Sequence, residues 1–191
     1  MRPPYRMMNR RERIYDELLA LRSQEGHGAA FEELVGRWQE RLWRHAWRLT
    51  GDEEAAWDAL QEGWIAISRG LRGLGDVTAF PAWAYRIVSN KCRDWIRRER
   101  RRRKGDQEYS EVAFRAPAGP DSAEEERCAD LGQALGRLSG NDRAILALRY
   151  HDGFDVAQVA EILGIPEGTV KSRLHHARNR LRAMMEVVDH E

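Results

Sequence analysis

Cationic and hydrogen-bonding side chains gather in one stretch near the C-terminus, residues 165–182, which reads IPEGTVKSRLHHARNRLR. Pro166 suits the first position of a helix, where no backbone N–H is needed, and Glu167 complements the positive end of the helix dipole. Arginine and lysine can bond phosphates and guanine edges, while serine and threonine can bond either phosphates or bases. The chemistry that these residue types support is contact with DNA along one face of a helix.

The opposite face of the same stretch is apolar, because hydrophobic residues recur there at steps of three and four. The face expected to be buried comprises Val170, Leu174, Ala177, Leu181 and Met184. The polar residues that fall largely off it are Lys171, Ser172, Arg173, His175, Arg178, Asn179 and Arg182. One side of this helix should therefore pack, while the other can touch phosphates and base edges.

A shorter helical pattern precedes this segment. Residues 155–163 have the spacing of a helix, and Asp155 is a suitable N-cap. Gly164 supplies the tight corner between two short helices that a helix-turn-helix requires. An ordinary pair of helices with a solvated basic face would give the same spacing, but the charge of the second helix favours DNA binding.

A second cationic region, residues 97–104, ends a helical pattern that begins near Thr78 or Phe80. Every residue in it except one glutamate is basic, a density that attracts nucleic-acid phosphates. A solvated helix end is the alternative for such a run taken alone. Amide and cationic side chains precede the run, however, and this neighbourhood favours nucleic acid. These side chains are Asn90, Lys91 and Arg93.

The scaffold that positions these groups is predicted to be helical. Between residues 11 and 104 the helical pattern is broken only near residues 23–28, 50–52 and 70–78, which predicts four or so packed helices. The apolar stripes expected to face a core are Ile14, Leu18 and Leu21; Phe31, Leu34, Val35, Trp38, Leu42 and Ala46; Ala56, Leu60, Trp64 and Ile67; and Trp83, Ile87 and Trp95. The polar side of the third helix carries Asp58, Gln61 and Glu62.

Residues 105–126 have a different composition, because prolines and glycine break the periodicity and acidic residues dominate. A tether between two basic modules, a strand that occupies a channel built for RNA, and a plain solubilising spacer all fit this composition. The predicted fold is all-α, with two small helical domains joined by a flexible acidic linker. The expected boundaries are an N-terminal helical extension at 1–24, a first domain at 25–104, the linker at 105–126, a four-helix domain with the helix-turn-helix at 127–186 and a tail at 187–191.

Composition narrows the classes of function. The chain has 191 residues, of which 42% are hydrophobic and 33% charged, and its net charge of +1 hides a strong segregation of sign. No apolar run is long enough for a membrane span and no secretion signal is evident, so a cytoplasmic protein without membrane insertion is expected. Two isolated cysteines, six histidines and many carboxylates form no nucleophile, metal or phosphate-loop pattern. We therefore expect no enzyme activity, no metal and no cofactor.

The combination of both modules resembles the extracytoplasmic-function group of sigma factors, the promoter-specificity subunits of bacterial RNA polymerase, over about residues 25–185. Residues 55–67, AAWDALQEGWIAI, are similar to the segment of that family that docks on the polymerase clamp helices. Residues 79–98 resemble its promoter-melting segment, and residues 146–182 resemble its reader of the upstream promoter element. The resemblance implies a bacterial, cytoplasmic transcription initiation factor that performs no covalent catalysis.

The resemblance also implies partners and site residues. The partners are core RNA polymerase, through its clamp helices and flap, and promoter DNA; an anti-sigma factor is a further candidate. The residues implied for polymerase binding are Asp58, Gln61 and Glu62, for which a solvated helix face is the alternative. Those implied for the downstream promoter element are Phe80, Asn90, Lys91, Arg93, Arg97 and Arg98. Those implied for the upstream element are Arg149, Thr169, Lys171, Ser172, Arg173, His176 and Arg178.

His176 departs from the commonest pattern of this family, which has arginine at that position. A neutral imidazole offers one donor and one acceptor and attracts phosphate more weakly than guanidinium does. We therefore expect an altered upstream preference or a pH-dependent interaction with DNA. The competing function is a stand-alone helix-turn-helix regulator, which would need neither the polymerase-binding segment nor the basic N-terminal module.

Overall fold

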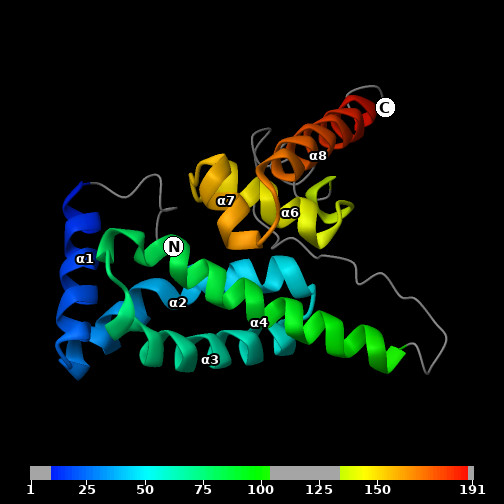
Figure 1. Ribbon diagram of the computed structural model, residues 1–191. Helices are drawn as coiled ribbons and strands as arrows, with labels where there is room; N and C mark the ends of the chain where they lie inside the picture. The colour runs from blue at the N-terminus through cyan, green and yellow to red at the C-terminus, as the bar shows by residue number, and fades with distance from the viewer. Residues whose placement is uncertain (1–9, 104–133, 189–191) are drawn as a thin grey trace, which may run out of the picture.

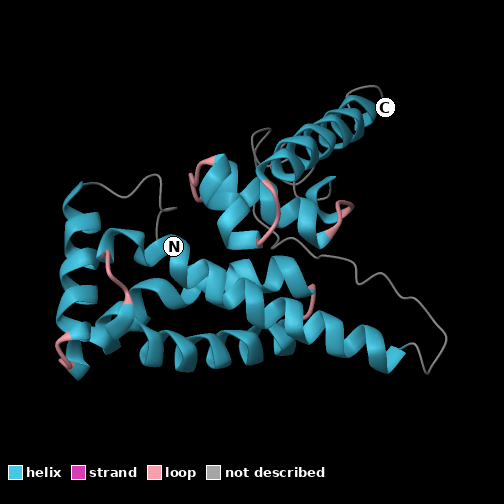
Figure 2. Cartoon of the chain, in the orientation of Figure 1, coloured by secondary structure: helices cyan, strands magenta, loops and turns pink. Residues whose placement is uncertain are grey.

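The computed structural model of the chain describes residues 10–103 and 134–188 (Figure 1). Regular structure in these two ranges is entirely helical, which confirms the predicted all-α class (Figure 2). No helix within them combines the length and the apolar character needed to cross a membrane. The predicted linker, residues 105–126, lies outside the described residues, so its boundaries stay a prediction.

The first module consists of α1 (Arg10–Gln24), α2 (Gly28–Thr50), α3 (Glu53–Gly70) and α4 (Phe80–Arg103), with short 3-10 turns η2 (Leu71–Gly73) and η3 (Val77–Ala79) before α4. Trp38 is fully buried at its centre, with its ring 5.6 Å from that of Phe80 and 6.5 Å from that of Tyr85. Both contacts are edge-to-face, a favourable arrangement of aromatic quadrupoles. Through these ring contacts, α2 packs against α4.

The turn between α2 and α3 is formed by two local capping interactions. Gly51 adopts the left-handed conformation, with φ of 71°, and its N–H donates to the Trp47 carbonyl to end α2. The Asp52 side chain accepts a hydrogen bond from the Ala55 N–H and starts α3. So short a turn makes α2 and α3 antiparallel neighbours.

The predicted orientation of α1 is wrong. Ile14, Leu18 and Leu21 were expected in the core, but they are 52%, 41% and 45% exposed. Leu19 and Asp16 face inward instead, at 4% exposure each. The reason is that polar contacts with other elements orient the helix.

Those contacts come from the middle and from the C-terminal end of α1. In the middle, Asp16 pairs with Arg37 of α2, and the Tyr15 hydroxyl donates to Glu33 Oε1 at 2.8 Å. At the C-terminal end, Gln24 Nε2 donates to the carbonyls of Leu71 and Leu74, at 2.9 and 2.6 Å. The spacing of apolar residues within one helix carries no information about such contacts with distant parts of the chain.

The second module contains α6 (Gly140–Leu146), the π-helical turn η4 (Ala147–His151), α7 (Val156–Leu163) and α8 (Glu167–Val188). Asp155 caps α7 through a capping box with Gln158, which confirms the predicted N-cap. Gly164 ends α7 in the left-handed conformation, with φ of 59°, and makes the predicted corner before α8. Val170, Leu174 and Ala177 of α8 are buried, while Leu181 and Met184 are half-buried.

The two modules pack against each other. In Figure 1 the second module lies over α2 and α4, and contacts join α4 with α7 and α2 with α6. Tyr85 of the first module and Phe154 of the second stack edge-to-face, with ring centroids 5.1 Å apart. One continuous core therefore runs through both modules.

Candidate functional site

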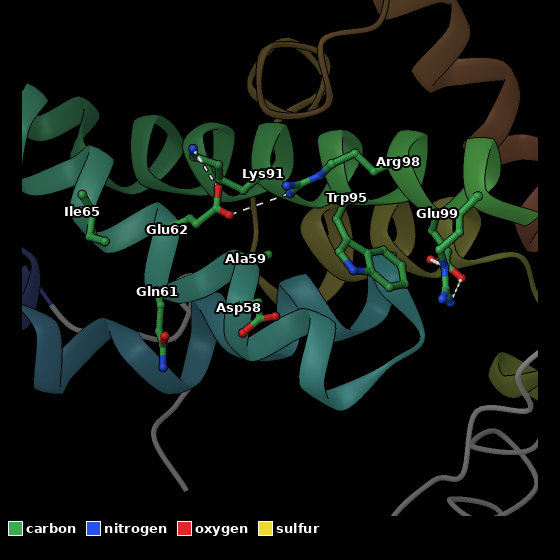
Figure 3. Close-up of a pocket in the computed structure, with 10 residues that line it drawn as sticks. Asp58, Ala59, Gln61, Glu62, Ile65, Lys91, Trp95, Arg98 and Glu99 are labelled. Atoms are coloured by element: carbon green, nitrogen blue, oxygen red, sulfur yellow. Dashed lines mark hydrogen bonds and ion pairs between the residues drawn. The ribbon is translucent and has the colours of Figure 1, made fainter.

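A groove of about 390 Å³ runs between α3 and α4. The two helices approach closely because Gly63 faces Val88, and a Cβ at Gly63 would lie 3.0 Å from Val88 Cγ2. Figure 3 shows acidic, amide, aromatic and basic side chains around the groove. Its lining residues are Asp58, Ala59, Gln61, Glu62, Ile65, Lys91, Trp95, Arg98, Glu99 and Arg102.

This groove brings together residues that the sequence had assigned to two surfaces. Glu62 of α3 accepts a hydrogen bond from Lys91 Nζ of α4 at 3.1 Å and lies 3.8 Å from Arg98 Nη2 (Figure 3). Asp58 and Gln61 are exposed beside this pair. The charge of Glu62 is therefore neutralised locally, while Asp58 and Gln61 form an exposed edge with one carboxylate and one amide.

Sequence reasoning missed apolar groups near this edge. Ile65 and Trp57 of α3 are 51% and 38% exposed, although both are large and hydrophobic. Trp95, which was expected to face the core, lines the groove and is half-buried. The sequence did contain a sign of their exposure, because the helical spacing places Trp57 and Ile65 outside the buried stripe of α3. Exposed apolar groups beside polar ones are typical of protein interaction surfaces.

The assignment of Phe80 to the surface for the downstream promoter element is wrong. It is 1% exposed and packs on Trp38 from the first position of α4. A ring in that position belongs to the core and cannot receive a base. The ring instead anchors the start of α4 on α2.

The remaining downstream candidates lie along α4. Asn90, Arg97 and Arg98 are exposed, and Arg97 lies 3.8 Å from Asp94. Arg93 differs from them, because its guanidinium hydrogen-bonds Asn90 Oδ1 and reaches the second module. A Cβ at Gly164 would lie only 2.8 Å from Arg93 Nη1, so this cation rests on the corner of the helix-turn-helix.

The upstream candidates lie on or near α8. Those that are exposed are Lys171, Ser172, His176 and Arg178, while Thr169 and Arg173 are half-buried. Arg149 of η4 donates to the Phe154 carbonyl at 3.2 Å, so it supports the loop before α7. The geometry therefore offers a continuous polar face on α8 with its apolar face buried beneath it.

Two groups that could serve in covalent or acid–base chemistry, Cys92 and His45, are buried. Burial raises the pKa of the Cys92 thiol to about 12, so the reactive thiolate is absent at neutral pH. His45 is fully buried, and burial lowers its pKa to about 3. In the part of the chain that the structure describes, no cluster of three or more histidine, cysteine or carboxylate side chains could hold a metal ion.

Comparison with known families and proteins links both modules to transcription. Residues 34–102 match the family described as Sigma-70 region 2, and residues 128–181 match Sigma-70, region 4. The chain is 37% identical over 148 residues to the ECF RNA polymerase sigma factor SigL of Mycobacterium tuberculosis, covering 76% of this chain and 82% of that protein. It is 34% identical over 176 residues to SigM of the same species, covering 92% and 87%.

Solved structures share the fold. CnrH, in complex with the cytosolic domain of CnrY, matches with a TM-score of 0.61 and 25% identity over 91% of this chain and 98% of that one. The sigma factor RpoE of Bartonella quintana, in a co-crystal with the anti-sigma factor NepR, matches with a TM-score of 0.65 and 24% identity, covering 82% of this chain and 97% of that one.

Proposed function

Because this chain belongs to the extracytoplasmic-function sigma factors of the sigma-70 family, we propose that it uses three surfaces to direct core RNA polymerase to promoters. The observation that carries the proposal is the polar face of α8, which is exposed above a buried apolar face within the segment that matches Sigma-70, region 4. The first module supplies the other two surfaces, on α3 and α4.

The acidic and amide edge of α3 binds the polymerase clamp helices. Asp58 and Gln61 are exposed there, and Ile65 adds apolar area to the same edge. Carboxylates at such a rim attract basic groups on a partner and orient its approach. Glu62 takes part through its pair with Lys91, which joins the polymerase surface to the DNA surface on α4.

The cationic side of α4 holds the melted strand of the downstream element. Asn90 offers an amide for base contacts, and Lys91, Arg97 and Arg98 offer charge for phosphates. Arg93, which lies beside Gly164, adds a further cation to this set. Phe80 takes no part, because it is buried.

The upstream element is read by α8 in the major groove. Lys171, Arg173 and Arg178 suit guanine edges or phosphates, and Thr169 and Ser172 suit either. His176 lies exposed on the same helix, where it sets this chain's own sequence preference. Arg149, which lies beside α7, binds a phosphate of the DNA backbone.

The protein performs no covalent chemistry of its own and works in the bacterial cytoplasm, where core polymerase is found. Its family membership supports both statements. An anti-sigma factor is a further partner. This extension is supported by CnrH and RpoE, whose structures contain the cytosolic domain of CnrY and the anti-sigma factor NepR.

Run-off transcription from a randomised promoter library tests the proposal. Purified core RNA polymerase is supplied with or without the protein, and the transcripts are sequenced. Protein-dependent initiation from templates that share two spaced elements is the expected result. Sequence-specific DNA binding combined with failure to associate with an active core enzyme would instead favour the stand-alone regulator.

A charge reversal localises the polymerase surface. We expect Asp58→Lys to weaken association with core polymerase by about tenfold or more, because it opposes like charges across the interface. Glu32→Lys is the matched control, since Glu32 is an exposed carboxylate on α2 outside the groove. Equal losses for both variants in a core-binding titration would show that general charge, not this edge, governs binding.

A further inference from the structure

One face of α1 leaves large apolar side chains in contact with solvent. Ile14, Leu18 and Leu21 recur at steps of four and three residues, and they are 41% to 52% exposed. We define the α1 stripe as these three residues. The helix packs on α2, η2 and η3 through its other face, and Figure 1 shows it at the left edge of the molecule. Exposed apolar surface that is grouped in this way is typical of an interaction site.

Charged residues continue the line of the α1 stripe at both of its ends. Arg11 lies about one turn before Ile14, Glu25 lies about one turn after Leu21, and both charged residues are exposed. The Glu25 N–H donates to the Leu21 carbonyl at 3.2 Å, so Glu25 continues the last turn of α1. Its carboxylate lies 3.5 Å from His27 Nε2, and both side chains of this pair are more than half exposed. The stripe therefore has a cation at its N-terminal end and an anion at its C-terminal end.

This order of charges favours antiparallel pairing of α1 with α1 of a second copy of the chain. With Leu18 on a two-fold axis, a residue seven positions before Leu18 lies opposite the residue seven positions after it in the second copy. Arg11 then faces Glu25 at both ends of the pair, and Ile14 lies at the level of Leu21. A parallel pair would place each charge opposite its own equivalent, which like-charge repulsion disfavours. A two-fold antiparallel pair is also closed, so association stops at the dimer.

Two other occupants suit the α1 stripe less well. Residues 1–9 directly precede α1, but they contain two arginines and no carboxylate, so they offer no partner to Arg11 or to its exposed neighbours Arg10 and Arg22. An anionic lipid surface would attract these arginines, yet it would repel Glu25. A second copy is the occupant that uses the charges at both ends of the stripe.

We propose that α1 is a self-association surface, through which two copies of the free chain form an antiparallel dimer centred on Leu18. The helix has 15 residues, so the pair buries less area than the roughly 1,200 Å² at which stable interfaces begin. The dimer is therefore weak, with a dissociation constant in the micromolar range or above. None of the residues proposed above for polymerase or DNA lies on α1, so this inference does not depend on the proposed function.

Sedimentation velocity of the full chain across the micromolar range tests the association. The average sedimentation coefficient should rise with protein concentration toward the value of a dimer. Leu18→Glu places two carboxylates opposite each other on the axis, and it should weaken association by about tenfold or more. Because Leu18 is exposed, this variant should still fold. Ile65→Glu is the matched control, since Ile65 is a similarly exposed apolar residue on α3, and it should associate as the wild type does.

A charge swap tests the antiparallel register. Arg11→Glu places carboxylates opposite each other at both ends of the pair, and Glu25→Arg does the same with arginines. Each single variant should weaken association by roughly threefold or more, because two exposed contacts per dimer change from attraction to repulsion. The double variant restores opposite charges and should recover the wild-type dissociation constant. In a parallel pair, each single variant would only exchange one like-charge contact for another and would associate as the wild type does.

Several outcomes would overturn the proposal. A wild-type chain that stays monomeric across the whole range would do so, and so would a dimer that is broken by Ile65→Glu but not by Leu18→Glu. A monomeric chain that co-sediments with phosphatidylglycerol vesicles would assign the α1 stripe to a lipid surface instead. Wild-type association by both single charge variants would refute the antiparallel register.

Discussion

His45 is a histidine kept neutral by its surroundings. It is fully buried in α2, and its Nε2 lies 2.7 Å from Ser89 Oγ. Its pKa is lowered from 6.5 to about 3, chiefly by burial; the charge of Asp152 acts in the opposite direction, and the charge of Arg48 adds a smaller lowering effect. An imidazolium at this position would lose hydration without gaining a full ion pair.

This pKa predicts a dependence of stability on pH. The unfolded chain binds a proton on His45 below pH 6.5, while the folded protein does not until pH approaches 3. Stability contributed by His45 is therefore complete above pH 6.5 and falls as pH decreases through this window, by up to about 1.4 kcal/mol per pH unit. Urea unfolding at pH 7.5 and 5.5 measures the loss. His45→Gln should show a smaller difference between the two pH values, and an equal difference would contradict the prediction.

His176 is exposed on α8, where its proposed role is contact with DNA. Replacing it by arginine should strengthen attraction to phosphate or redirect recognition toward guanine, which arginine reads through two hydrogen bonds. The expected change in discrimination at one base pair is about 1 to 3 kcal/mol. Sequencing transcripts from the randomised library with each protein gives the measurement. Unchanged affinity and unchanged preference would remove His176 from the DNA interface.

At the scale of the element, α1 shows that an apolar stripe does not have to face the core. Leu18 is 41% exposed and Leu19 is 4% exposed, in the orientation set by the contacts of Asp16 and Gln24. Leu19→Ala should therefore lower the free energy of unfolding by about 2 to 5 kcal/mol, because it leaves a cavity. Leu18→Ala, the matched control, should change it by less than about 0.5 kcal/mol. If urea unfolding showed a larger loss of unfolding free energy for Leu18→Ala than for Leu19→Ala, the orientation predicted from the spacing would be supported instead.

At the scale of the whole molecule, the shared core couples the two modules. All seven tryptophans lie in the first module, so tryptophan fluorescence follows the unfolding of that module alone. Phe154 belongs to the second module, but it packs on Tyr85 across the interface. Phe154→Ala should therefore lower the tryptophan-detected melting temperature, by roughly 4 °C or more, as expected for a loss above 1 kcal/mol. A fluorescence transition that stays in place while the second module melts earlier by circular dichroism would indicate independent modules.

The amino-acid sequence by itself determined the helical class and most local boundaries. Periodicity, caps and breakers act over a few residues, and for that reason Asp155 and Gly164 could be placed correctly. The cationic face of α8 could also be predicted from the sequence, because charge and spacing within one helix are local properties. Pro166, predicted at the first helical position, precedes α8 by one residue.

The tertiary structure decided which faces are buried and which residues meet. Phe80 and Ile14 were misassigned because a hydrophobic side chain is buried only if another element covers it. Likewise, no spacing along the chain relates Glu62 to Lys91 or Arg93 to Gly164, since these contacts join separate helices. The closed packing of the two modules depends on shape and on partners distant in sequence, which only the folded chain brings together.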